Sequence, residues 1–480
     1  MVPELCRLTA VDAVAALERG EVSPVELIDA AAARIEAVEP HINALPTRCL
    51  ERARDHARRL ASQARPTEGP WLGGLPVSIK DLNPVAGVRT TFGSPIYADN
   101  VPARSDILVE RLERHGGIVV AKSNTPEFGA GASTFNEVFG KTRNPWNTAK
   151  SVAGSSGGAA ASVASGEVWL AHGSDLGGSL RTPASFNAVV GLRPSPGRVP
   201  HGPRPQAFTG LPVEGPIARN VADVALFLDA ICGLDREDPL SFDRPATSFL
   251  DAVRERRAPL RVGFSPDLGI LPVASEVRSI CAAAAARFAD TGASVDDACP
   301  DFSEAIDAFQ VLRASLFAAG HAGHLRDHRD KLKPEVIWNI EKGLALTAAE
   351  IGAAEAARSR LYHSTAAFFA DHDVLACPTA IVAPFDVDVR YVEEVEGHRF
   401  DNYVHWIGIT FAVTLTGCPS VSIPAGFTAD GLPVGIQLVG PPRGEARLLA
   451  AAACLEDVLG IAPRLPIDPH GPDGRNLLVP

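Results

Sequence analysis

The feature that most constrains this chain is the segment 151–191, which contains two turns rich in glycine and serine. The first turn spans Gly154 to Gly158, the second is Gly177-Gly178-Ser179, and an alanine-rich stretch and a short apolar run lie between them. Because glycine has no side chain, backbone N–H groups in such turns can converge on one point, as a developing oxyanion requires. One such cluster alone would be read as an ordinary loop. Two of them, each carrying serine hydroxyls, favour a site for nucleophilic catalysis.

Strand-like and helix-like stretches alternate along the whole chain without a break in composition, which predicts one large α/β domain. Strands are expected at 75–79, 116–121, 168–171, 261–264, 374–379, 413–417, 420–424 and 432–440, and near 294. Helices are expected from a capping box at Ser23 up to Pro40, and at 50–64, 159–164, 220–232, 275–289 and within 302–370.

Composition limits the partners and the compartment. Hydrophobic residues make up 46% of the 480 and charged residues 21%, an ordinary globular balance. A net charge of −12 argues against nucleic acid or an anionic membrane as partner, since both reward a basic surface. Eight scattered cysteines without a CxxC pair, and no apolar run of the ~18 residues that span a membrane, predict a cytoplasmic protein with free thiols.

Lysine is rare in this chain, where only seven of the 45 basic residues are lysines. A lysine in an apolar context therefore suggests a role that arginine cannot fill, such as giving up its proton. Lys80 and Lys122 both follow strand-like apolar runs. The residues alone leave both open as candidate bases, and an ordinary ion-paired lysine is the alternative for each.

Three other kinds of chemistry are weighed and ranked lower. His321, His324 and His328 share one helical face, but no HExxH pattern accompanies them, and we expect no metal and no cofactor. Gly154 to Gly158 fits the G-x-S-x-G nucleophile elbow, which needs a preceding strand and a later Asp and His. Cys418 is interpreted as a packed residue rather than a nucleophile.

Four further stretches, together with the two turns, resemble the signature of the amidase signature family. These stretches are G-L-P-V-S-I-K-D at 74–81, K-S-N-T-P-E at 122–127, T-R-N-P-W at 142–146 and E-G-P-I-A-R at 214–219, and the spacing of the motifs agrees as well. The family includes fatty acid amide hydrolase, malonamidase, peptide amidase and the glutamine-hydrolysing component of glutamyl-tRNA amidotransferase. The resemblance covers most of the chain.

The resemblance implies a mixed, twisted sheet between helical layers and a Ser-Ser-Lys triad. In that triad Ser179 is the nucleophile, Ser155 the bridge and Lys80 the base. The backbone N–H groups of residues 176–179 would hold the oxyanion, that is Leu176, Gly177, Gly178 and Ser179. Ser156, Asp175 and Arg181 would support the site. Leu176 stands where many members have threonine.

The expected substrate is a small alkyl or aryl amide, split into an acid and ammonia or an amine. This rests on apolar segments that include Phe128, Gly129, Gly131 and Trp406 as candidate contacts. Two alternatives stay open: a glutamine-hydrolysing amidotransferase subunit, which the Leu180-Arg181-Thr182 sequence disfavours, and a catalytically silent scaffold. We expect a homodimer and a single domain, 1–480, made of N-terminal helices (1–70), a signature core (71–230), a variable region (231–465) and a proline-rich tail (466–480).

Overall fold

The computed structural model describes residues 2–60, 64–67 and 69–479, and its centre is one mixed sheet. The sheet has eleven strands in these residues. In spatial order they are β1 (Thr47–Arg48), β3 (Ile118–Ser123), β2 (Pro76–Lys80), β8 (Leu170–Asp175), β10 (Val213–Ala218), β9 (Val190–Arg193), β16 (Ser420–Phe427), β17 (Pro433–Val439), β13 (Val374–Pro378), β11 (Arg261–Phe264) and β12 (Ser294–Asp297). The predicted α/β class is confirmed.

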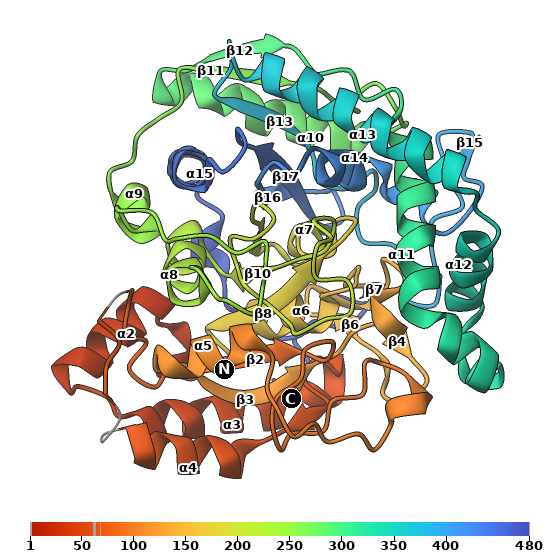
Figure 1. The fold of residues 1–480 in the computed structure, drawn as a ribbon. Coiled ribbons are helices and arrows are strands. Elements are labelled where there is room, and N and C mark those ends of the chain that lie inside the picture. The colour runs from red at the N-terminus through yellow and green to blue at the C-terminus, as the bar shows by residue number, and fades with distance from the viewer. Residues whose placement is uncertain (1, 61–63, 68, 480) are drawn as a thin grey trace.

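Helices cover both faces of this sheet (Figure 1). They are α1 (Glu4–Arg7), α2 (Ala10–Arg19), α3 (Pro24–Ile42), α4 (Leu50–Leu60), α5 (Ile107–Arg114), α6 (Gly157–Ala164), α7 (Arg181–Asn187), α8 (Val221–Ile231), α9 (Phe249–Arg254), α10 (Ser275–Ala286), α11 (Ala305–His328), α12 (Pro334–Leu344), α13 (Ala348–Phe368), α14 (Gly408–Thr416) and α15 (Glu445–Leu459). Three short hairpins lie outside the sheet: β4 (Phe135–Asn136) with β5 (Gly140–Lys141), β6 (Arg143–Asn144) with β7 (Asn147–Ser151), and β14 (Glu394–Val395) with β15 (His398–Arg399).

Strand β3 illustrates why the central strands are apolar at successive positions. Ile118 and Val120 pack into one hydrophobic cluster with α3, α4 and α6, and Val119 packs into the other, larger cluster. Successive strand side chains point to opposite faces, so a strand covered on both sides must be apolar throughout. Such a run has no polar alternation, and its short length together with flanking turn residues identifies it as a strand.

Helix starts follow the expected capping chemistry, whereas two helix predictions need correction. Ser23 and Glu26 form the capping box of α3, as predicted, but Pro40 lies inside the helix, which ends at Ile42 with Asn43 in the left-handed conformation. The predicted helix 50–64 ends at Leu60, and residues 61–63 lie outside the described part.

The expected strand at 413–417 is wrong, because this segment forms the end of helix α14. Every residue of α14 is buried. A helix buried on all sides shows no amphipathic period, so its apolar, β-branched sequence cannot be distinguished from that of a buried strand.

The sheet topology brings two candidate site residues to one edge. Strands β2 and β8 are parallel neighbours, with Ser78 paired to Ala171, so Lys80 and Asp175 lie at the carboxyl ends of adjacent strands. Side chains at this edge of an α/β sheet meet in a crevice. The antiparallel strand β10 begins beside Asp175, with Glu214 opposite Ser174.

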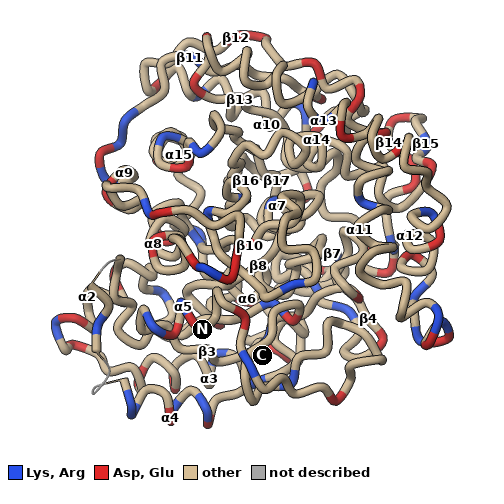
Figure 2. The backbone as a smooth tube through the Cα atoms, in the orientation of Figure 1, with Lys and Arg blue, Asp and Glu red and all other residues tan. Residues whose placement is uncertain are grey.

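Acidic and basic side chains are interspersed over the periphery of the molecule (Figure 2). No helix of the described residues is long and apolar enough to cross a membrane. All four groups of the predicted subdivision contribute to one connected fold, and its internal boundaries remain predictions.

Candidate active site

The signature segment is almost wholly buried, except at the second glycine turn. Within residues 151–195 only Ser174, Leu176 and Ser179 are partly exposed. The opening therefore lies at the end of β8 and the turn that follows, where a small molecule can reach the Ser179 hydroxyl.

Lys80 is fully buried beside this turn and is surrounded by hydroxyl groups. Its Nζ lies 2.7 Å from Ser155 Oγ, 2.8 Å from Ser156 Oγ and 3.0 Å from Ser174 Oγ. Burial lowers the pKa of Lys80 to about 7, although Glu214 and Asp175 act in the opposite direction. An amine with this pKa is partly neutral near neutral pH and can accept a proton from a hydroxyl group.

Lys122, the other candidate base, occupies a different environment. Its Nζ lies 3.2 Å from Asp81 Oδ1, 2.7 Å from the Asn83 carbonyl and 2.9 Å from Thr90 Oγ1. These partners use all three ammonium hydrogens and supply a carboxylate. Lys122 is therefore an ion-paired lysine within the fold, which is the alternative considered for it.

The second turn is organised by the Asp175 carboxylate. It accepts hydrogen bonds from the N–H groups of Gly178 and Leu180, at 2.9 and 3.1 Å, and from two guanidinium nitrogens of Arg181, both at 3.0 Å. Burial raises the pKa of Asp175, but Arg181 and Arg193 outweigh it and hold the pKa well below its ordinary value. Asp175 and Arg181 thus shape the turn.

The N–H groups expected to face an oxyanion differ in what they contact. The Gly178 N–H donates to Asp175. Among the described residues, those of Leu176, Gly177 and Ser179 have no protein acceptor. Gly178 has a φ of 120°, and a Cβ there would lie 2.2 Å from Thr410 Oγ1, so only glycine fits this position.

The two turns are joined through their backbones. The Ser156 N–H donates to the Ser179 carbonyl at 3.2 Å, and the Gly154-Ser155 peptide bond is cis. Ser155 is thereby held between the Lys80 amine and the turn that carries Ser179. This brings together the three residues predicted from the sequence.

Helices from the second half of the chain form walls around the turn. A Cβ on Gly177 would lie 3.1 Å from Phe309 on α11 and 3.5 Å from Ile407, in the short 3-10 helix His405–Ile407. The Thr410 hydroxyl donates to the Gly177 carbonyl at 2.7 Å. The side chains that contact the turn are thus largely apolar.

The four residues predicted to bind substrate lie in three places. A Cβ on Gly129 would lie 3.5 Å from Ser155 Oγ, so this glycine borders the site. Phe128 stacks on His324 with ring centroids 5.1 Å apart, and Gly131 faces Lys333. Trp406 is fully buried against Phe385, whereas its neighbour Ile407 contacts the turn.

The other chemistries considered from the sequence find no support in the geometry. His321 and His324 contact each other at 3.1 Å and His324 contacts Tyr97, and the described residues contain no group of three that could hold a metal ion. The elbow-like Ser155 contacts Lys80 instead of a histidine. Burial raises the pKa of the Cys418 thiol to about 11, which disfavours the thiolate.

Three residues at the site were not singled out from the sequence: Ser174, Thr410 and Glu214. Ser174 and Glu214 lie within quoted motifs, but their contact with Lys80 depends on the pairing of β8 with β10. Thr410 lies more than 200 positions from Gly177, and only the folded chain brings them together.

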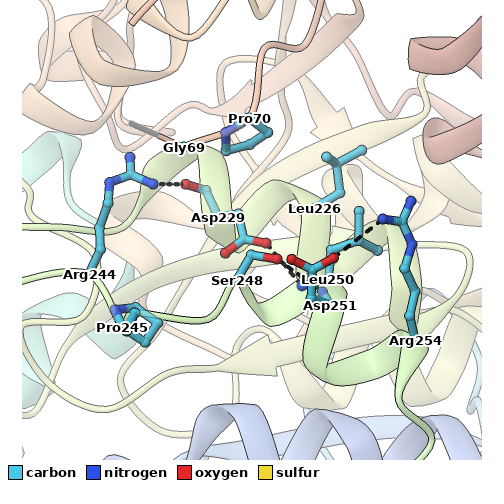
Figure 3. Close-up of a pocket in the computed structure, with 11 residues that line it drawn as sticks. Gly69, Pro70, Leu226, Asp229, Arg244, Pro245, Ser248, Leu250, Asp251 and Arg254 are labelled. Carbon is cyan, nitrogen blue, oxygen red and sulfur yellow. Dashed lines mark hydrogen bonds and ion pairs between the residues drawn. The ribbon is translucent and has the colours of Figure 1, made fainter. Parts of the chain in front are cut away.

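A separate cavity of about 670 Å³ lies away from these residues (Figure 3). Its polar groups already contact one another: Asp229 accepts from the N–H groups of Phe249 and Leu250, and Arg244 donates to the Asp229 carbonyl. None of the predicted site residues lines it.

Comparisons with known proteins agree with this geometry. The family model described as Amidase matches residues 26–449. An acylamidase of Rhodococcus erythropolis is 36% identical over 96% of this chain and 97% of its own. A glutamyl-tRNA(Gln) amidotransferase component of Synechococcus sp. (strain CC9605) is also 36% identical, over 91% and 93%. The solved structure of a bacterial aryl acylamidase superposes with a TM-score of 0.87 at 27% identity, over 96% and 99%.

Proposed function

The chain belongs to the amidase family of amide hydrolases, and on that premise we propose that it cleaves a small carboxylic amide through an acyl-enzyme on Ser179. The observation that carries this proposal is the 2.7 Å contact between Lys80 Nζ and Ser155 Oγ, in a buried cluster where the lysine has hydroxyl partners. A desolvated amine beside a serine is suited to accept that serine's proton.

The reaction begins when Ser179 Oγ attacks the amide carbonyl carbon. Ser179 gives its proton to Ser155, and Ser155 gives its own to neutral Lys80. The relay then runs backwards and protonates the amide nitrogen, so the C–N bond breaks and ammonia or an amine leaves. Water next attacks the ester on Ser179 with the same groups acting as base, which releases the acid and restores the hydroxyl.

The oxyanion of each tetrahedral intermediate is stabilised by backbone N–H groups of the second turn. Those of Leu176, Gly177 and Ser179 are free to do this, while the Gly178 N–H supports the turn through Asp175. Such preorganised donors contribute on the order of 3 kcal/mol each to lowering the barrier. Asp175 and Arg181 act by holding these donors in place.

The substrate is an uncharged alkyl or aryl amide. Phe309 and Ile407 supply apolar surface beside the turn, and Phe128 adds aromatic surface next to Gly129. The names of two relatives, an acylamidase and an aryl acylamidase, support the same class.

The test is a panel of aliphatic, aryl, cyclic and charged amides, with release of acid and of ammonia or amine measured for the wild type and for Ser179→Ala. We expect turnover of uncharged amides and none by the variant. Preference for a charged amide such as malonamate would contradict the apolar pocket, and unchanged turnover by Ser179→Ala would contradict the nucleophile.

A glutamine-hydrolysing amidotransferase subunit is the second candidate, because relatives that carry the amidotransferase name are as similar in sequence. Glutaminase activity without turnover of acyl amides would favour it. The expected homodimer and cytoplasmic location remain predictions, which sedimentation and cell fractionation would test.

A further inference from the structure

A third carboxylate lies behind the Lys80 cluster, on the strand next to it. Glu214 is directly opposite Ser174 in the antiparallel pair of β10 and β8, and Ser174 Oγ lies 3.0 Å from Lys80 Nζ. Opposite residues in such a pair have Cβ atoms about 5 Å apart on the same face of the sheet. The Glu214 side chain therefore projects from the same face as the hydroxyl that contacts Lys80.

Two imidazole rings hold the Glu214 carboxylate in place. His172 Nε2 lies 2.8 Å from Oε2, and His201 Nδ1 lies 3.2 Å from Oε1. His172 is two positions from Ser174 on β8, and both histidines are buried. Each carboxylate oxygen thus accepts a hydrogen bond from a different ring, which fixes the carboxylate plane.

This cluster keeps Glu214 charged although it is buried. Burial raises the pKa of Glu214, but the hydrogen bonds from His172 and His201 outweigh this and hold it well below its ordinary value. Asp106 and Arg204 also face Glu214, and Asp175 is the other carboxylate that acts on Lys80. The negative charge of Glu214 is therefore present throughout the working pH range.

We propose that Glu214, oriented by His172 and His201, is a positioning residue that sets how readily Lys80 gives up its proton. This inference rests on the proposed function. A lysine that is buried without any nearby negative charge stays neutral but is a weak base. With Glu214 behind it, Lys80 remains strong enough to take a proton from Ser155 and still releases it near neutral pH.

The sign of the effect on pH dependence follows directly. A carboxylate favours the protonated amine, so removing its charge lowers the proton affinity of Lys80. The rising limb of the acylation rate should then move to lower pH. A neighbouring opposite charge within about 6 Å typically shifts a pKa by about 1 to 3 units.

The experiment measures inactivation of the full-length enzyme by a sulfonyl fluoride from pH 5 to 10, for wild type, Glu214→Gln and Glu214→Asp. Mass spectrometry locates the label in each. Glutamine keeps an acceptor for one histidine and removes the charge, and we expect its limb to move down by about one unit or more. Aspartate retracts the charge by one methylene group, and its limb should move in the same direction by less.

Glu445→Gln is the matched control. Glu445 is fully buried on α15, accepts a hydrogen bond from the Ser195 N–H and pairs with Arg198, so it tests the loss of a buried carboxylate elsewhere. Its limb should stay at the wild-type position. An unshifted or upward-shifted limb in a folded Glu214 variant, with Ser179 still labelled, overturns the inference. A wild type that is not labelled at Ser179 instead overturns the proposed function and the inference with it.

Discussion

Lys80 and Lys122 are both fully buried at the ends of neighbouring strands, and their partners distinguish them. Lys80 contacts hydroxyl groups, whereas Lys122 contacts Asp81. Lys80→Arg should therefore lose acylation, because a guanidinium does not release its proton, while Lys122→Arg should keep appreciable activity. Turnover of a chromogenic anilide checks both, with circular dichroism as the control for folding. Activity in Lys80→Arg and none in Lys122→Arg would mean that the base is misassigned.

The pH dependence of the wild type is a second prediction at the residue scale. Because burial lowers the pKa of Lys80 to about 7, the amine is protonated below this pH and cannot act as a base. The value of kcat/KM should rise through about pH 7 and then level off. A limb near pH 10, the range of an exposed lysine, would show that Lys80 is not the group that titrates.

At the scale of elements, helix α14 holds the second turn from outside the signature segment. The Thr410 hydroxyl donates to the Gly177 carbonyl, and Arg181 donates to the Thr410 carbonyl. Thr410→Val keeps the side-chain shape and removes the hydroxyl, so we expect kcat to fall by about tenfold or more, equivalent to ~1.4 kcal/mol. Steady-state kinetics measures this.

Thr416→Val on the same helix is the control, because its buried hydroxyl donates to the Val413 carbonyl and does not contact the turn. Its kcat should remain near that of the wild type. Equal losses in the two variants would indicate a general effect on α14.

How well each element can be predicted depends on how local its signals are. The capping box of α3 and the Asn220 cap of α8 are encoded within four residues, and both helices begin as predicted. Strand β11, Arg261–Phe264, also matches its expected bounds. Helix α7 is not predicted, because its residues 181–187 lie between a glycine turn and a buried strand and carry no amphipathic period.

The candidate site is predictable only as far as its motifs extend. Lys80, Ser155 and Ser179 are identified by their resemblance to a known signature, and the fold brings their segments together. The contacts of Thr410 and Glu214 depend on pairing between segments distant in sequence, which composition and periodicity do not encode.

At the scale of the whole molecule, Arg34 ties both ends of the chain together. Its guanidinium donates to the Ser165 carbonyl after α6, to the Ile467 carbonyl and to Asp468 in the C-terminal tail. Arg34→Ala leaves these acceptors buried, so the free energy of unfolding should fall by about 3 kcal/mol. Denaturant unfolding measures this. Arg54→Ala, at the exposed ion pair with Asp29, should cost less than about 1 kcal/mol, and a cost equal to that of Arg34→Ala would contradict this account.

The central claim is that Ser179 is the nucleophile of a Ser-Ser-Lys relay. The most direct measurement is mass spectrometry of peptides from the intact enzyme after reaction with a fluorophosphonate probe. We predict one modified residue, Ser179, in the wild type, and no modification in Lys80→Ala at neutral pH. A label on Ser156, on Ser174 or on a cysteine, with Ser179 unmodified, would contradict the account.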